Sequence, residues 1–213
     1  MVIAAQTLVR EDVRVRVFID FWNFQLALNK RLPNFQLDWK KLGPWLAERA
    51  GRVFLDAGQQ GRIHFEGLHI YLSHDPSKVG DEGLRKWATN TLDRFPGVQV
   101  VLKERRPKDP PSCPSCHQAV SSCPACKASM KGTTEKGIDT AIVTDMIRLA
   151  WEDSWDLAVL LTGDADFVPA VEFLNQKGRK VIHGGFPPQG MHLSKKCWGS
   201  FDVTQGLKEI SRT

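Results

Sequence analysis

The sequence lacks long hydrophobic runs. No stretch stays apolar for the roughly 20 residues that a helix needs to cross a bilayer. The first residues, MVIAAQTLVREDVRVRV, also lack a basic segment before an apolar stretch of signal-peptide length. We therefore expect a cytoplasmic protein that does not associate with a membrane.

A strong excess of charge of either sign is also absent. The 213 residues include 29 Lys and Arg against 24 Asp and Glu, a formal net charge of +5. This excess is compatible with a polyanionic partner and equally with an ordinary basic surface. Because 42% of the residues are apolar, the chain can bury the core of one domain, and we expect a single domain over residues 1–213.

Cysteine is scarce outside one short segment, CPSCHQAVSSCPAC, which contains Cys113, Cys116, Cys123 and Cys126. Cys197 stands alone. Two C-x-x-C pairs this close together supply four thiolates, the ligand set of a tetrahedral Zn²⁺ site. Disulfides, an iron–sulfur cluster, or His117 in place of one thiolate are the alternatives. We predict a structural zinc ion in a module inserted over residues 107–131.

Apolar runs alternate with helical periodicity along the rest of the chain. The runs predict strands over residues 13–20, 63–73, 98–103, 156–162 and 179–185. Helices are predicted after the first strand and over residues 37–50, 81–95, 136–152 and 164–178, and Pro44 should kink or interrupt the second helix. This alternation indicates an α/β fold, a doubly wound and mainly parallel sheet with right-handed crossovers. We find no internal repeat, and residues beyond Gly185 match no predicted element.

Polar side chains follow two of the predicted strands. Asp20 and Asn23 come after the first strand, and Asp164 and Asp166 come after a later one, in the segment LLTGDADF. Ligands of open parallel sheets bind outside the carboxyl ends of the strands, so we expect these acids to line a cleft instead of being buried. Gly163 is expected to permit a sharp turn there. Helix capping alone would explain one acid of that turn, but it does not explain Asp20.

A further acid, Asp139, falls in the first turn of the helix predicted over residues 136–152. Carboxylates that converge on one point repel each other unless a divalent cation holds them, and Mg²⁺ or Mn²⁺ prefers such oxygen ligands. Asp145 lies about 9 Å further along the helix and roughly 120° around it, so it cannot share a face with Asp139. We predict metal-assisted attack of water on phosphorus, with Asp145 and Thr162 in supporting positions behind the ligands.

Three segments, VFIDFWNF, KGIDTAIVTDMIRLA and AVLLTGDADFVPAVEFLNQKGRKVIHGG, together resemble the NYN domain of the LabA/DUF88 family, within the PIN-like ribonuclease superfamily. The resemblance spans most of residues 15–185. It implies a parallel sheet in the order 3-2-1-4-5, an acidic Mg²⁺-binding cleft and hydrolysis of RNA. The positions that match the family's catalytic residues are Asp20, Asn23, Asp139, Asp164 and Asp166, with the four acids as metal ligands; Asp145 matches a further family acid.

The chain departs from that family in two places. Phe21 and Trp22 stand where small residues are more common, and we favour packing over base stacking for both. The cysteine module is an insertion between the third strand and the next helix. Since some family members only bind RNA, a non-catalytic RNA- or protein-binding regulator that uses this module is the main alternative function.

Two other enzyme classes fit the sequence less well. A haloacid-dehalogenase-type phosphatase needs a second acid two residues after the first, and Trp22 occupies that position. A dinucleotide-binding enzyme needs a glycine-rich turn after the first strand, and DFWNFQ contains no glycine.

Positive charge gathers around the cysteine module, where residues 103–136 contain seven basic residues against three acids. We predict that Arg105, Arg106, Lys108 and Lys136 guide an RNA backbone toward the acidic cleft, with a solvated loop as the alternative. The expected partner is therefore RNA, while a homo-oligomer or a protein partner stays open.

Overall fold

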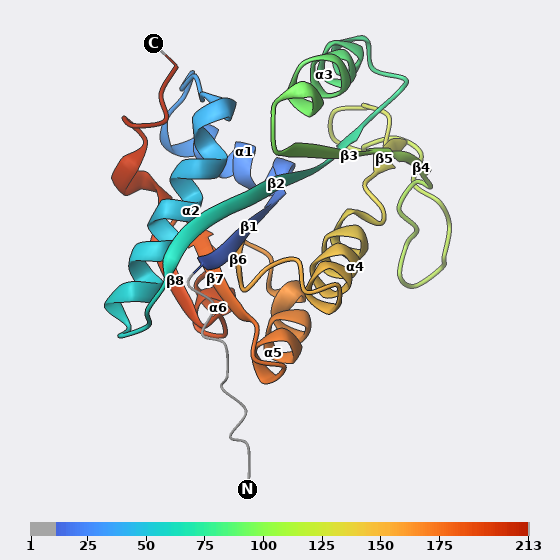
Figure 1. Ribbon diagram of the computed structural model, residues 1–213. Helices are drawn as coiled ribbons and strands as arrows, with labels where there is room; N and C mark the ends of the chain where they lie inside the picture. The colour runs from blue at the N-terminus through green and yellow to red at the C-terminus, as the bar shows by residue number, and fades with distance from the viewer. Residues whose placement is uncertain (1–11, 213) are drawn as a thin grey trace, which may run out of the picture.

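The computed structural model describes residues 12–212. Residues 1–11 lie outside the described residues. They include the start of the predicted single domain and most of the segment in which we expected no signal peptide. One parallel sheet has the order β3-β2-β1-β6-β7-β8 (Figure 1). Its strands are β1 (Asp12–Asp20), β2 (Arg62–His74), β3 (Val98–Glu104), β6 (Leu157–Leu161), β7 (Lys180–Gly185) and β8 (Gly199–Asp202).

This strand order confirms the fold predicted from the sequence. The five predicted strands correspond to β1, β2, β3, β6 and β7, and they pair in the order 3-2-1-4-5. The sixth strand, β8, comes from the segment beyond Gly185 and pairs parallel with β7. The sheet is therefore one strand wider than the sequence pattern indicated.

Helices cover both faces of the sheet (Figure 1). α1 (Phe21–Arg31) and α2 (Trp39–Asp56) lie on one face, and α4 (Ile138–Trp151) and α5 (Val168–Gln176) lie on the other. α3 (Val79–Asn90) and the 3-10 turn η1 (Leu92–Arg94) connect β2 to β3. The helix predicted over residues 164–178 is a 3-10 turn, η2 (Ala165–Phe167), followed by α5; α6 (Met191–Ser194) and η3 (Val203–Gly206) flank β8.

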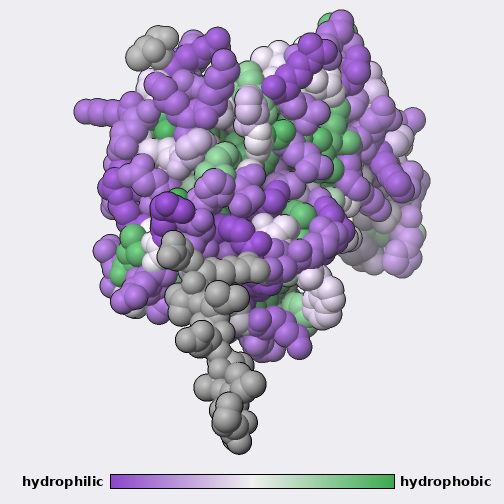
Figure 2. All heavy atoms as spheres, viewed as in Figure 1, coloured by the Kyte–Doolittle hydropathy of each residue, from purple (hydrophilic) through white to green (hydrophobic). Residues whose placement is uncertain are grey.

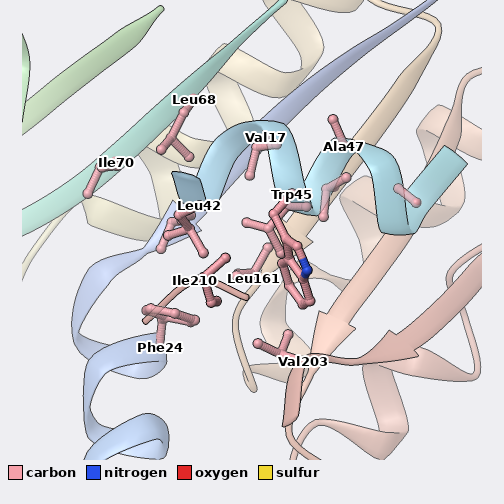
Figure 3. Packing of buried hydrophobic residues seen from close by; sticks show 14 of the residues in the cluster. Val17, Phe24, Leu42, Trp45, Ala47, Leu68, Ile70, Leu161, Val203 and Ile210 are labelled. Atoms are coloured by element: carbon pink, nitrogen blue, oxygen red, sulfur yellow. The ribbon is translucent and has the colours of Figure 1, made fainter. Parts of the chain in front are cut away.

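The side chains of β1 alternate between two apolar cores. Val15, Val17 and Ile19 are fully buried on the side of α1 and α2, and Phe18 is fully buried on the side of α4 and α5. Figure 3 shows Val17 among the residues that pack on the first side. Burying each of these side chains contributes about 1.5–3 kcal/mol, so the register of β1 is strongly determined. This register places Asp20 at the carboxyl edge of the sheet.

α2 packs closely on β2 through small residues. A Cβ atom on Gly43 would lie 2.6 Å from the Phe65 ring, and one on Gly51 would lie 2.5 Å from Ile63. Of the predicted kink or interruption at Pro44, the interruption is absent, because the helix runs unbroken from Trp39 to Asp56. Pro44 removes one hydrogen bond near the start of the helix, and the buried face of α2 offsets that loss.

The inserted segment is carried by a two-stranded antiparallel pair, β4 (Arg106–Lys108) and β5 (Gly132–Thr134). Contrary to prediction, it contains a repeat, because residues 111–120 and 121–130 have matching sequence and hydrogen bonds. In each half the N–H of the first cysteine donates to the carbonyl five residues later, at 2.9 and 2.8 Å. The carbonyl of that cysteine accepts from the N–H four residues later, which belongs to His117 or Lys127, both with positive φ. Each half is therefore a closed turn around a C-x-x-C pair.

The surface in view in Figure 2 is mainly hydrophilic, with smaller apolar patches among the polar side chains. Within residues 12–212, no helix is both long enough and apolar enough to span a membrane.

Candidate acidic site at the carboxyl ends of β1 and β6

Asp20 is the last residue of β1 and caps the N-terminus of α1. Its carboxylate accepts hydrogen bonds from the backbone N of Asn23 (3.2 Å), from Asn23 Nδ2 (2.9 Å) and from Thr162 Oγ1 (3.3 Å). The side chain is buried, so the prediction that the acids stay unburied is wrong for Asp20. Burial raises the pKa of Asp20, while these three donors act in the opposite direction and stabilise the carboxylate.

Thr162 connects three parts of the site. Its hydroxyl donates to Asp20 and accepts from the backbone N of Asp164 at 3.3 Å. Its carbonyl lies 2.7 Å from Nε2 of the buried His183, whose other ring nitrogen contacts the hydroxyl of Ser194. A carbonyl can only accept, so Nε2 carries the proton, and burial lowers the pKa of His183. A neutral His183 therefore holds Thr162 in place.

The turn after β6 brings Asp164 and Asp166 to the same edge of the sheet. Asp164 Oδ1 accepts from the backbone N of Asp166 at 2.9 Å, which caps η2. The backbone N of Gly163 donates to Asn23 Oδ1 at 3.3 Å. A Cβ atom on Gly163 would lie 3.1 Å from Gln189 Nε2 and 3.3 Å from Asn23 Oδ1. A larger residue at this position would therefore displace the side chains of Gln189 or Asn23 by a few tenths of an ångström.

Asp139, in the first turn of α4, faces the other predicted acids. Loss of hydration raises the pKa of Asp139 to about 6, and repulsion from Asp20, Asp164, Glu135 and Asp166 adds to this effect. The four acids predicted from the sequence thus lie within electrostatic reach of one another. Asp145 lies elsewhere: it accepts from the Tyr71 hydroxyl at 2.9 Å and pairs with Arg148 at 3.1 Å.

Glu135 is a fifth carboxylate that sequence reasoning missed. It lies between β5 and α4, and its carboxylate is bound by the hydroxyl of Ser73, at the end of β2. Arg105 Nη2 lies 4.0 Å from the same carboxylate. The only sequence signal was its place directly before the KGID segment.

We predicted only an RNA-binding role for Arg105, but its side chain also makes contacts within the fold. Its Nε donates to Ser73 Oγ at 3.0 Å, and its guanidinium lies 5.5 Å from the centre of the Trp22 ring. Trp22 Nε1 in turn donates to the Ser73 carbonyl at 2.8 Å, and the buried Phe21 packs on Trp39. These contacts confirm the packing interpretation of Phe21 and Trp22. The other predicted RNA-binding residues, Arg106, Lys108 and Lys136, are exposed.

The donor chemistry of the acidic site fits Mg²⁺ or Mn²⁺. All the converging groups are carboxylates, and hard divalent cations prefer oxygen ligands. In the part of the chain that the structure describes, no group of three or more His, Cys, Asp or Glu side chains lies close enough to hold one ion. Mg²⁺ needs only one or two protein carboxylates, because it retains several water ligands. The arrangement therefore suits a hydrated ion.

The cysteine module consists of two separate closed turns, each around one C-x-x-C pair. All five cysteines are free thiols. Hydrogen bonds from the backbone N–H groups of Cys116 and Ser115 lower the pKa of Cys113, and the equivalent bonds lower the pKa of Cys123. The two turns are not drawn together around one point. Burial raises the pKa of Cys197 to about 12, so this thiol is not a reactive thiolate.

Known proteins share this fold. A crystal structure of a protein of unknown function from Vibrio parahaemolyticus aligns with 91% of this chain and 94% of its own chain, with a TM-score of 0.53 and 16% sequence identity. At that identity the likeness concerns the fold alone. No curated protein matches this chain. Residues 14–200 match the NYN domain, which has a PIN-like nuclease fold, and the chain therefore belongs to the NYN domain family.

Proposed function

We propose that this protein is a Mg²⁺- or Mn²⁺-dependent ribonuclease that hydrolyses phosphodiester bonds of single-stranded RNA. The observation that supports this proposal most directly is the gathering of carboxylates around Asp139, where repulsion from Asp20, Asp164, Glu135 and Asp166 adds to lost hydration in raising its pKa. Such repulsion is relieved by a divalent cation, and an acidic site without a cation would repel the phosphates of RNA.

The residues that would hold the hydrated metal ion, directly or through its water ligands, are Asp20, Asp139, Asp164 and Asp166. A bound ion would lower the pKa of a water molecule and neutralise charge on the phosphate. Asn23 and Thr162 hold the Asp20 carboxylate in its ionised form and in a fixed orientation. A bound divalent cation would lower the raised pKa of Asp139, so its carboxylate would be ionised at neutral pH when the ion is present.

We further propose that Cys113, Cys116, Cys123 and Cys126 bind one Zn²⁺ with a structural role. Each turn already holds its cysteine pair in place through matching backbone hydrogen bonds. A metal ion would draw the two turns together, and four thiolates leave no open position for a substrate. The module follows β3 and returns through β5 to Glu135, so its stem lies beside the acidic site.

The ribonuclease proposal is tested with a labelled single-stranded RNA and added Mg²⁺ or Mn²⁺. Asp20→Asn should abolish cleavage and leave the fold intact, because asparagine keeps the size of the side chain. Asp56→Asn is the matched control, since Asp56 is an exposed acid at the end of α2. Cleavage that persists in excess EDTA, or a full rate for Asp20→Asn, would contradict the mechanism. RNA binding by the parent protein without any cleavage would favour the non-catalytic regulator.

A further inference from the structure

A groove leads away from the acidic site over the end of α1; we call it the α1 groove. It consists of three adjoining hollows. The first is lined in part by Asn23, Thr162, Gly163 and Gln189, and the second by Leu26, Lys30, Arg31 and Gln189. The third is lined in part by Arg31, Leu32 and Lys208. Neighbouring hollows share Gln189 or Arg31, so they adjoin one another from Thr162, which donates to Asp20, to the C-terminal segment.

The α1 groove crosses the region where α1 and the C-terminal segment lie together, while the cysteine module lies on the other side of the molecule (Figure 1). Leu37 and Ser211 form a β-bridge there, and the backbone N of Asp38 donates to the Ile210 carbonyl at 2.8 Å. The C-terminal segment therefore forms a fixed wall of the groove.

The charged residues of the groove are mainly basic. Lys30 and Lys208 are exposed, and Arg31 is held in place because it donates to the Phe186 and Pro187 carbonyls. Its one acid, Glu209, is paired with Arg49 and so is largely neutralised. Three cations thus lie along adjoining hollows that begin at Asn23 and Thr162, the two residues whose side chains donate to the Asp20 carboxylate.

Exposed apolar side chains accompany these cations. Leu26 is 61% exposed and Leu32 is 40% exposed, and each lines a hollow next to Arg31. A duplex hides the faces of its bases, whereas single-stranded RNA presents phosphates and apolar base faces in alternation. A surface that combines cations with exposed leucines is complementary to the single-stranded form.

We propose that the α1 groove binds the single-stranded RNA on one side of the scissile phosphate, with Lys30, Arg31 and Lys208 contacting successive parts of its backbone. This inference rests on the proposed ribonuclease function and identifies where its substrate lies. The strand would cross the carboxyl edge of the sheet, and the acidic site would contact only the phosphate that is cleaved.

The test measures RNA binding and cleavage separately. Binding of a fluorescent single-stranded RNA is measured by anisotropy in the Asp20→Asn background with Mg²⁺, so that cleavage does not interfere. Lys30→Ala combined with Lys208→Ala removes two groove cations and leaves Arg31, which has structural contacts. The control, Arg52→Ala with Lys177→Ala, removes the same charge near the amino ends of the strands.

For the groove variant we expect the Kd to rise about 5- to 10-fold at 0.1 M salt. The slope of log K against log salt should become shallower by about 1.4, because each phosphate contact with a single strand contributes about 0.7. The control variant should keep the parental affinity and slope. In the active background, cleavage at sub-saturating RNA should fall with the affinity for the groove variant and stay at the parental rate for the control variant.

Equal affinity and slope for the groove and control variants would overturn the inference. If the parent still cleaves RNA in that case, only the position of the substrate is wrong and the ribonuclease function stands. A parent that neither binds nor cleaves single-stranded RNA would overturn both. Binding of poly-glutamate that is lost in the groove variant, with RNA affinity unchanged, would point to an acidic protein partner and would also overturn the RNA assignment.

Discussion

Thr162 Oγ1 donates a hydrogen bond to Asp20 Oδ2 over 3.3 Å, which joins the carboxyl ends of two adjacent strands that are 142 residues apart in the sequence. The same hydroxyl accepts from the backbone N of Asp164 at 3.3 Å. One small side chain therefore orients a buried carboxylate and fixes the turn that carries two further acids.

Thr162→Val should reduce RNA cleavage roughly 10-fold or more at saturating metal. Valine keeps the shape of threonine but cannot donate, and a hydrogen bond to a charged group contributes about 1.5–3 kcal/mol. The pKa of Asp20 should rise further, so the acidic limb of the pH–rate profile should move to higher pH. Thr162→Ser retains the hydroxyl and serves as the control. A Thr162→Val enzyme with the parental rate and pH profile would show that this hydrogen bond is dispensable.

Asp139 should make the stability of the metal-free protein depend on pH. The pKa of Asp139 is raised from 3.8 to about 6, so the folded protein binds more protons than the unfolded chain between about pH 4 and pH 6. Stability should therefore fall as the pH rises through that window, by at most about 1 kcal/mol because solvent screens the repulsion. Thermal unfolding across pH should show this loss, and both added Mg²⁺ and Asp139→Asn should remove it. An Asp139→Asn variant with the parental pH dependence would contradict this account.

The strand order and the acid cluster could be predicted because both depend on local patterns. Apolar runs identify buried parallel strands, and the ends of such strands meet at one edge. Asp20 and Asp164 lie at that edge and, together with Asp166, raise the pKa of Asp139 by repulsion. Their role as metal ligands stays a prediction. The buried state of Asp20 could not be predicted, because it depends on donors from Asn23 and Thr162.

The elements that were missed depend on contacts between distant residues. β8 has only four residues and, within residues 12–212, pairs with β7 alone, so its sequence carries little strand signal. Glu135 meets Ser73 across 62 positions, and Arg105 meets Ser73 across 32. The ten-residue repeat of the cysteine module could have been recognised in the sequence. Each repeat unit is too short to fold independently.

The purified protein should contain one zinc ion per chain, measured by elemental analysis, with no iron chromophore. Cys113→Ser should abolish zinc binding and loosen residues 109–131, seen as faster hydrogen exchange there than in the sheet, because metal binding contributes directly to local folding. Cys197→Ser is the control and should keep the zinc, since Cys197 lies outside the module. Zinc-free protein, or zinc retained fully by Cys113→Ser, would exclude the four-thiolate site.

The basic residues at the stem of the module should separate into two functional groups. Arg105→Ala should lower the free energy of unfolding by about 1–2 kcal/mol, because it removes a hydrogen bond to Ser73 and the cation above Trp22, and leaves Glu135 without its nearest cation. Arg106→Ala with Lys108→Ala should change stability by less than about 0.5 kcal/mol, since both side chains are exposed.

RNA binding should show the opposite pattern in these variants. Loss of Arg106 and Lys108 should weaken RNA binding and make its salt slope shallower by about 1.4, while cleavage at saturating RNA changes little. Arg105→Lys keeps a charge but cannot reproduce the planar contact with Trp22, so it should keep the parental RNA affinity and recover only part of the stability lost in Arg105→Ala. Chemical denaturation and salt titrations of RNA affinity, made on the same preparations, separate these effects. If Arg105→Ala is fully stable and loses as much salt dependence as the double variant, Arg105 binds RNA directly and the structural role inferred from Ser73 and Trp22 is wrong.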